Sequence, residues 1–282
     1  MIFDERLMIQ TKLIYSMRFL PILLLFLFAT CKNSPSVELS GNLPIDSTVY
    51  IDLYNAISGK QILLDTIIGH TFHLKIDSIA AGIYTVVFSW KRDILKPTEL
   101  KRYARFGEGD LPRYVLSKSV WLDPKESRKY TFSISEGLDQ SQLEQGLLDE
   151  DWGADLSVNA KGENFRLYQE FTDITKKYSL VNLKAKDSLK QIIYKLNESG
   201  DLEASRLLNQ QLSTVWVNGL RDSLVQEEVS FLKKNIATIP VPYIFYSLVN
   251  TQSDFDTYKE VYDALSPKIK ETLAKRMSIY LK

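Results

Sequence analysis

Hydrophobic and polar residues alternate along residues 37–135. In the stretch STVYIDLYN, the apolar residues Val49, Ile51 and Leu53 alternate with other side chains, and HTFHLKID, GIYTVVFSW, SKSVWLDP and RKYTFSIS repeat the pattern. A period of two is typical of β-strands with one buried face, and glycine-containing turns separate the runs. The pattern predicts about seven short strands, which favours an antiparallel β-sandwich or an open barrel.

The period changes to that of helices after residue 160. Phe165, Tyr168 and Phe171 follow one another at intervals of three residues, which places them on one buried face of a helix. The chain is therefore predicted to be α+β. We expect a β domain over residues 37–136 and an all-α helical domain over residues 161–282, each with a core of its own.

Several helix boundaries can be read from capping signals. Gly200 suits the end of one helix and Asp201 the N-cap of the next, which we expect to run through to about residue 235. A capping box is predicted at Ser253, with Asp256 three residues later. The last helix is expected to begin at Ser266, which precedes a proline.

A segment rich in acidic residues separates the two predicted domains. Residues 138–155 contain six acidic residues and no basic one. Asp149, Glu150 and Asp151 could chelate a hard cation, but the ligand spacing of a calcium loop is absent. We therefore interpret residues 137–160 as a solvated acidic linker.

The N-terminal part has the order of an export signal. Residues 19–28 form an apolar run that is too short to cross a bilayer. Lys12 and Arg18 precede the run and small residues follow it, as in a secretory signal. Because Asp4 and Glu5 are unusual in front of such a signal, we expect Met17 to be the true start.

The signal ends in the stretch FATC, which resembles the lipobox of bacterial lipoproteins. The resemblance implies that residues 1–31 are a lipoprotein signal peptide, and that diacylglycerol is attached to the sulfur of Cys31. Phe28 and Thr30 depart from the usual lipobox residues, so a plain cleaved signal and an unprocessed buried segment remain alternatives. Residues 32–36 are polar and suit a tether.

These features together imply a location in the cell envelope. We expect a lipid anchor in the membrane, with the protein facing the periplasm from the outer membrane, because the tether lacks the acidic residues that accompany export to the surface in such bacteria.

The strand region resembles a known family. The stretches VELSGNL, TVYIDLYN, KQILLDTIIGHTFHLKID, GIYTVVFSW and SVWLDPKESRKYTFSI look like DUF4369, a small β domain of unknown function found in Bacteroidetes lipoproteins. There it often precedes a thioredoxin-like domain of the TlpA type, with helices between them. The resemblance implies a β fold and brings no catalytic residues.

Composition excludes several classes of partner and chemistry. The 282 residues include 35 basic and 35 acidic side chains, so no net field attracts nucleic acid. Cys31 is the only cysteine, which leaves no internal disulfide and no paired redox thiols within the chain.

One interruption of the strand pattern is a candidate binding loop. It lies between residues 90 and 117 and is too long for a hairpin turn. Its basic and aromatic residues could bind an acidic or sugar-like ligand or a partner protein, or could simply pack over the sheet edge. The candidates are Arg92, Arg102, Tyr103, Arg105, Phe106, Arg113 and Tyr114.

No catalytic constellation is visible in the sequence. His70 and His73 would point to opposite faces of a strand, so no metal site is expected, and no cofactor-binding motif is found. We expect a lipid-anchored binding or scaffold protein without catalysis of its own, whose partner is a periplasmic protein or a glycan. The alternative, implied by the family resemblance, is an accessory subunit of a thiol-disulfide exchange system whose thioredoxin-like domain is supplied by another protein.

Overall fold

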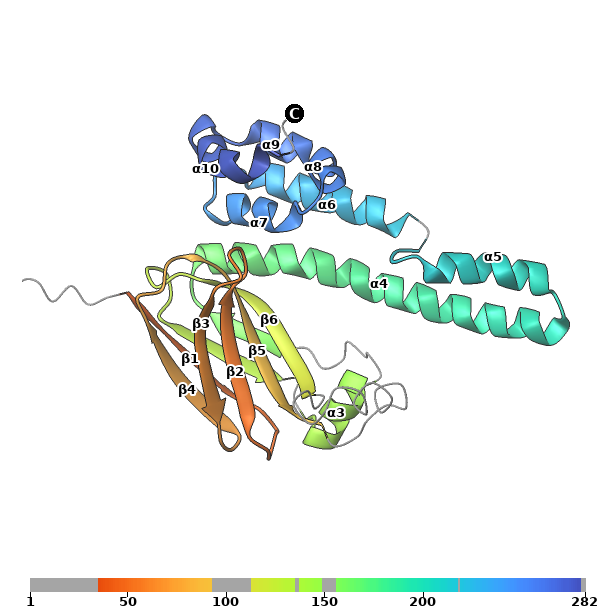
Figure 1. Ribbon diagram of the computed structural model, residues 1–282, viewed down its shortest axis with the longest axis horizontal. Coiled ribbons are helices and arrows are strands. Elements are labelled where there is room, and N and C mark those ends of the chain that lie inside the picture. Colours follow the sequence, from red (N-terminus) through yellow and green to blue (C-terminus); the bar gives the residue numbers. More distant parts are fainter. Residues whose placement is uncertain (1–34, 93–112, 135–136, 149–155, 218, 280–282) are drawn as a thin grey trace, which may run out of the picture.

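The chain folds into a β-sandwich with a helical region stacked over one end of it (Figure 1). The structure is a computed structural model that describes residues 35–92, 113–134, 137–148, 156–217 and 219–279. The predicted α+β class is confirmed.

Two four-stranded sheets form the sandwich, with strand orders β4-β1-β7-β8 and β3-β2-β5-β6. Neighbouring strands are antiparallel except for the parallel pair of β1 and β7. The strands are β1 (Ser36–Asn42), β2 (Val49–Asn55), β3 (Gln61–Ile67), β4 (Thr71–Asp77), β5 (Gly82–Lys91), β6 (Arg113–Leu122), β7 (Lys129–Ile134) and β8 (Leu156–Ala160).

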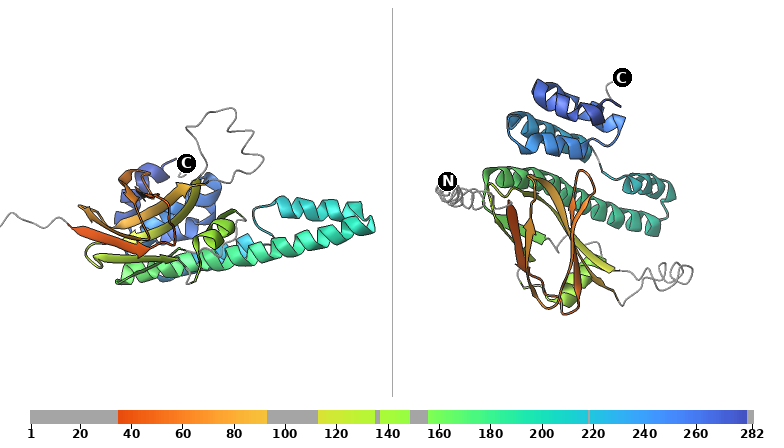
Figure 2. Two further views of the ribbon diagram at one scale, coloured as in Figure 1. Left: turned by 90° about the horizontal axis from the view of Figure 1, so that it is seen from below. Right: turned by 60° about the vertical axis from the view of Figure 1, so that its left-hand side comes forward.

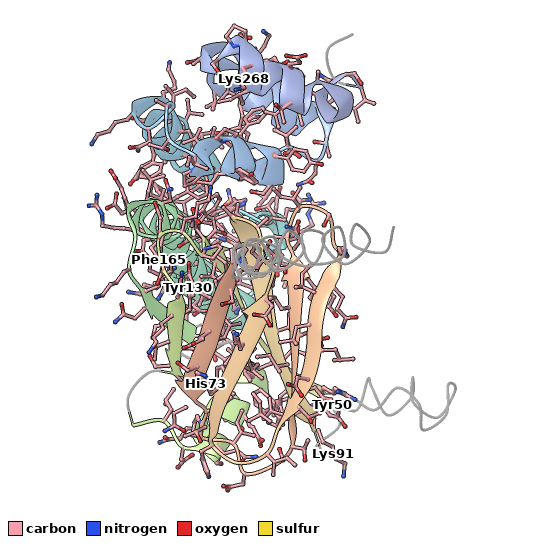
Figure 3. The ribbon with its side chains drawn as sticks, turned by 90° about the vertical axis from the view of Figure 1, so that its left-hand side faces the viewer. Tyr50, His73, Lys91, Tyr130, Phe165 and Lys268 are labelled. Carbon is pink, nitrogen blue, oxygen red and sulfur yellow. The ribbon has the colours of Figure 1, made fainter. Side chains whose placement is uncertain are left out.

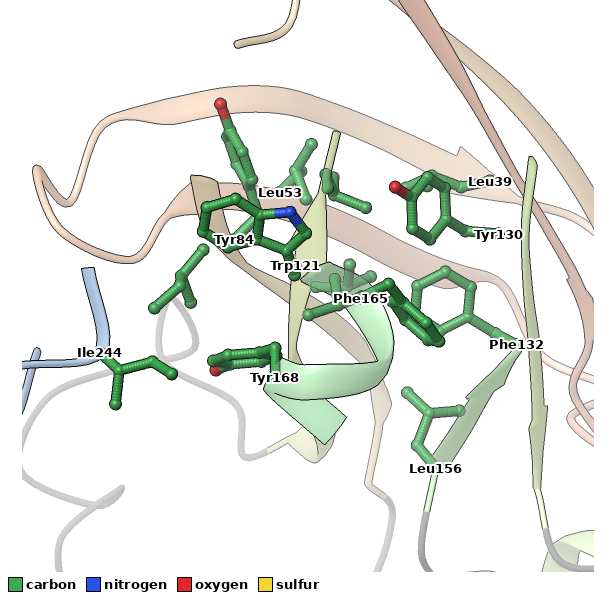
Figure 4. Packing of buried hydrophobic residues seen from close by; sticks show 14 of the residues in the cluster. Leu39, Leu53, Tyr84, Trp121, Tyr130, Phe132, Leu156, Phe165, Tyr168 and Ile244 are labelled. Atoms are coloured by element: carbon green, nitrogen blue, oxygen red, sulfur yellow. The ribbon is translucent and has the colours of Figure 1, made fainter. Parts of the chain in front are cut away.

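The alternation in the sequence matches the burial of the strands. Val49, Ile51 and Leu53 of β2 are fully buried, and Ile51 pairs with Phe88 of β5. Across the sandwich, the Phe88 ring lies 6.0 Å from that of Phe132 on β7. Figure 4 shows part of this core, where aliphatic and aromatic side chains of both sheets meet. Burial of one face of each strand therefore stabilises the sandwich.

The prediction of a solvated linker over residues 137–160 is wrong at two places. Helix α3 (Gln140–Leu148) buries Leu143, and its Glu144 accepts a hydrogen bond of 2.9 Å from the indole Nε1 of Trp90. Strand β8 pairs with β7, where Leu156 lies opposite Ile134. These contacts are made with residues distant in sequence, so the local acidic composition does not reveal them.

The remaining helices form a long arm and a compact cluster. They are α4 (Glu163–Ser199), α5 (Leu202–Ser213), α6 (Leu220–Lys234), α7 (Pro240–Leu248), α8 (Gln252–Thr257), α9 (Lys259–Ala264) and α10 (Pro267–Met277). Helix α4 crosses one end of the sheets, then projects beyond them and pairs with α5, as both views of Figure 2 show. No helix among the described residues is both long and apolar enough to span a bilayer.

Some predicted boundaries are confirmed and others are corrected. Gly200 has the left-handed conformation of a C-cap, with φ 80°, and the side chain of Asp201 caps α5. The predicted continuous helix to residue 235 is interrupted, because α5 ends at Ser213 and α6 begins at Leu220. The capping box lies at Thr251 and its partner Asp254, not at the predicted pair two residues later.

The sandwich and the helical region share one hydrophobic core. At the start of α4, the Phe165 ring packs edge-on against Tyr130 of β7 at 5.9 Å, and Figure 3 draws the two side by side. On the outer face of the other sheet, Trp121 of β6 is fully buried and packs edge-on against Tyr243 of α7 at 5.2 Å. The helices therefore complete the burial of the sandwich instead of forming a core apart from it.

Candidate functional site

The predicted binding loop is only partly within the described residues. Arg102, Tyr103, Arg105 and Phe106 lie outside them, as does Cys31. Arg92 directly follows β5 and is half-buried.

Arg113 and Tyr114 lie in strand β6, and they point to opposite faces of the sheet. The Arg113 guanidinium stacks over the Tyr50 ring, 4.2 Å from its centroid, on the outer face. The side chain of Tyr114 is 4% exposed and packs against Trp90 in the core, with 5.4 Å between the rings. The structure therefore gives Arg113 a surface position and Tyr114 a packing role.

A cavity of about 490 Å³ lies where the helical region meets the sandwich. In Figure 1, α7 and α10 lie above the end of the sandwich at which β2 turns into β3. The cavity is lined by Ile57, Ala237, Thr238, Ile239, Pro242, Tyr243, Tyr246, Ile269, Thr272 and Leu273. We call this the junction cavity, and its volume is in the range of small-molecule sites.

The floor contributed by the sandwich is Ile57, in the turn from β2 to β3. The side chain of Asn55 holds this turn, since its Oδ1 accepts hydrogen bonds from the backbone N–H of Ile57 at 3.1 Å and of Ser58 at 2.9 Å. Gly59 has a φ of 66°, a left-handed conformation that favours glycine. The local sequence NAISG therefore fixes where Ile57 projects.

The connection from α6 to α7 forms a second wall. The backbone N–H and the side-chain Oγ1 of Thr238 both donate to the carbonyl oxygen of Asn235, at 2.9 and 2.8 Å. Pro240 opens α7 at its first helical position, where a missing N–H costs nothing. The preceding Ile239 remains 55% exposed, so hydrocarbon lies at the rim of the cavity.

Helix α10 forms the third wall. Ser266 caps it, and Pro267 occupies its first turn, as predicted from the sequence. The hydroxyl of Thr272 donates to the carbonyl oxygen of Lys268 at 3.1 Å, while Leu273 is buried beside the cavity. Figure 3 places Lys268 at the opposite end of the molecule from Tyr50, so the junction cavity and the surface around Arg113 are separate sites.

One buried acid lies elsewhere in the helical region. Glu228 of α6 is 3% exposed and accepts hydrogen bonds from the hydroxyl of Tyr258 and, at 3.1 Å, from Thr175 of α4. Burial raises the pKa of this carboxyl, and the two hydroxyl donors oppose the rise. Each carboxylate oxygen thus accepts a hydrogen bond, and the group links three helical segments.

The two histidines have different surroundings. His70 precedes β4, and its Nε2 lies 2.9 Å from the carboxylate of Asp46. His73 lies on β4 itself and is exposed. Within the described ranges, no three His, Cys, Asp or Glu residues are grouped as metal ligands would be.

The junction cavity was not predicted from the sequence. Its floor at Ile57 is 180 to 216 residues away in the chain from its helical walls, and its lining residues are of the types that fill ordinary cores. The only local signal is the apolar run IPVPYIFY at residues 239–246, which is too apolar for a helix with one buried face.

Comparisons of this chain with protein-family models, with curated proteins and with solved structures each found no match. The resemblance to the DUF4369 domain therefore stays a prediction, and the functional reading of the chain depends on its own residues.

Proposed function

We propose that this protein is a lipid-anchored binding protein of the bacterial cell envelope, which holds its ligand in the junction cavity and catalyses no reaction itself. The observation that carries the proposal is the cavity of about 490 Å³ between the sandwich and the helices. Cavities of this size with mostly apolar walls are the usual form of small-molecule sites.

The polar groups near the helices support binding over catalysis. The buried carboxyl of Glu228 is 3% exposed, accepts hydrogen bonds from two hydroxyl groups of the protein and is not among the residues that line the junction cavity, so it is not placed to act on a molecule held there. Among the described residues that line the junction cavity there is no carboxylate, imidazole or thiol. A site of this composition can bind and orient a molecule through shape and burial.

The anchor can be tested by metabolic labelling with an alkyne fatty acid in a bacterial host that processes lipoproteins. The wild-type chain should incorporate the label and sediment with membranes, whereas Cys31→Ser should remain unlabelled and soluble, because only the thiol accepts the diacylglycerol. A Ser34→Ala variant serves as the control in the tether. Labelling of Cys31→Ser would contradict the anchor, and turnover of thiols, esters or glycosides by the purified chain would contradict the absence of catalysis.

A further inference from the structure

The chemistry of the junction cavity lining restricts what it can hold. None of the lining residues that the structure describes is acidic, basic or a histidine. A charged group placed among such side chains loses its hydration without gaining an ionic partner, which is strongly unfavourable.

Two lysines on the helices around the cavity are engaged elsewhere. Lys270 of α10 donates to the backbone carbonyl of Asp263 at 2.8 Å and lies 5.4 Å from the centroid of the Tyr262 ring. Lys233 of α6 forms an ion pair of 2.9 Å with Glu260. Neither cation is among the lining residues, so neither provides a counter-ion within the cavity.

The start of α7 is also a poor anion site. Helix N-termini usually attract anions because their first backbone N–H groups have no partner within the helix. Here the first and third positions of the helix are Pro240 and Pro242, which have no N–H. Only Val241 keeps an amide donor among the first three positions, and the adjoining Ile239 side chain places hydrocarbon at the rim.

The hydroxyl groups of the lining are neutral and partly used. Thr238 and Thr272 each donate their hydroxyl proton to a backbone carbonyl of the helical region, which leaves their oxygens as acceptors. Tyr243 and Tyr246 contribute aromatic faces with a polar tip, a combination that suits an apolar body with a weakly polar end.

We infer that the ligand of the junction cavity is an uncharged small molecule with a mainly hydrocarbon body. This inference rests on the proposed binding function and adds the class of ligand. Apolar cavities hold water poorly and bind apolar molecules that fill them. The volume of about 490 Å³ leaves room for a molecule of two or three fused or linked rings, or for an aliphatic chain.

Two fluorescent probes that differ by one charge test the inference. N-phenyl-1-naphthylamine is neutral, and 1-anilinonaphthalene-8-sulfonate has the same rings with an added sulfonate. Fluorescence titration of the full chain should give a dissociation constant for the neutral probe at least about tenfold lower than for the sulfonate.

Rim variants locate the site. Ile239→Lys adds a cation at the mouth of the cavity and should reduce the preference for the neutral probe by about fivefold or more. Ile239→Asp should lower the affinity for both probes, and should lower the affinity for the sulfonate more than that for the neutral probe. Ile239 is 55% exposed, so both variants are compatible with folding. Ile68→Lys is the matched control, because Ile68 is 86% exposed and directly follows β3 at the end away from the Ile57 turn, and it should leave both dissociation constants unchanged.

The outcomes separate the inference from the proposed function. Equal or tighter binding of the sulfonate to the wild-type chain would overturn the ligand class while leaving a binding site in place. A neutral-probe affinity that no Ile239 variant changes would overturn the assignment to the junction cavity. Failure of both probes to bind would overturn the inference, whereas the anchor and the absence of catalysis in the proposed function are decided separately by the Cys31→Ser labelling and the turnover assays.

Discussion

Ile244 of α7 gives a direct test of whether the sandwich and the helices unfold as one unit. Its side chain is fully buried, and Figure 4 draws it in the same cluster as Tyr168 of α4 and Trp121 of β6. Ile244→Ala removes buried methyl groups and should cost about 2–5 kcal/mol of unfolding free energy, while Ile244→Val should cost about 0.5–1.5 kcal/mol. With an m-value of about 3 kcal/mol/M, a loss of about 3 kcal/mol lowers the urea midpoint by about 1 M.

The assay is pulse-labelling hydrogen exchange along a urea gradient, read by mass spectrometry, since it follows α7 and β5 separately. Because one core joins the two regions, peptides from α7 and from β5 should shift to the same lower midpoint in Ile244→Ala. Leu207→Ala on α5 is the control, since Leu207 is 52% exposed and its truncation should change stability by no more than about 0.5 kcal/mol. A shift of the α7 peptides with an unchanged β5 midpoint would refute a shared cooperative core.

Three other variants test the polar contacts. The pKa of Glu228 is raised in the folded state, so wild-type stability falls as the pH rises from the ordinary glutamate pKa through the folded-state pKa. The melting temperature of Glu228→Gln minus that of wild type should therefore increase between about pH 4 and about pH 7. A difference that stays constant over this range would contradict the argument. Glu126→Ala removes the acceptor for the backbone and side-chain amides of Asn164 (3.1 and 2.7 Å) at the start of α4. It should lower the free energy of unfolding in urea by about 1 kcal/mol. An unchanged free energy of unfolding would show that water replaces the carboxylate as the acceptor. Gly162→Ala should cost about 1–3 kcal/mol, because φ is 120° and the added Cβ would lie 2.6 Å from the Glu126 carboxylate; wild-type stability would contradict that strain.

Local patterns predicted most of the fold. The seven strands of residues 37–135 follow from alternation, since the side-chain period of a strand directly reports which face is buried. The end of α4, the start of α5 and the start of α10 follow from Gly200, Asp201 and Ser266, because capping is satisfied within a few residues.

The features that sequence reasoning missed depend on distant contacts. Strand β8 forms by pairing with β7, where Leu156 lies opposite Ile134. Helix α3 is held in place by the hydrogen bond from Trp90 to Glu144. The sequence alone does not distinguish Thr251 from Ser253 as the N-cap of α8, because each is followed three residues later by an aspartate.

The candidate site shows the same limit. Periodicity indicates that Leu273 faces inward, but it does not show where packing leaves space between elements. Tyr114 was predicted as a loop residue and is instead a core residue of β6, because the strand begins at Arg113, four residues before the predicted start at Ser117. The cavity lies between α7, α10 and the turn from β2 to β3. The relative placement of these three elements is not encoded in any local sequence pattern.

The most direct test of the central claim is hydrogen exchange of the full chain with and without saturating N-phenyl-1-naphthylamine. If the ligand occupies a cavity between the sandwich and the helices, exchange should slow at once in three places: the turn of residues 56–60, the segment of residues 236–246, and α10. The arm of α5 should exchange at its unliganded rate, since it contributes no lining residue. Protection confined to the helices, with the turn around Ile57 unchanged, would contradict a binding site shared by the two regions.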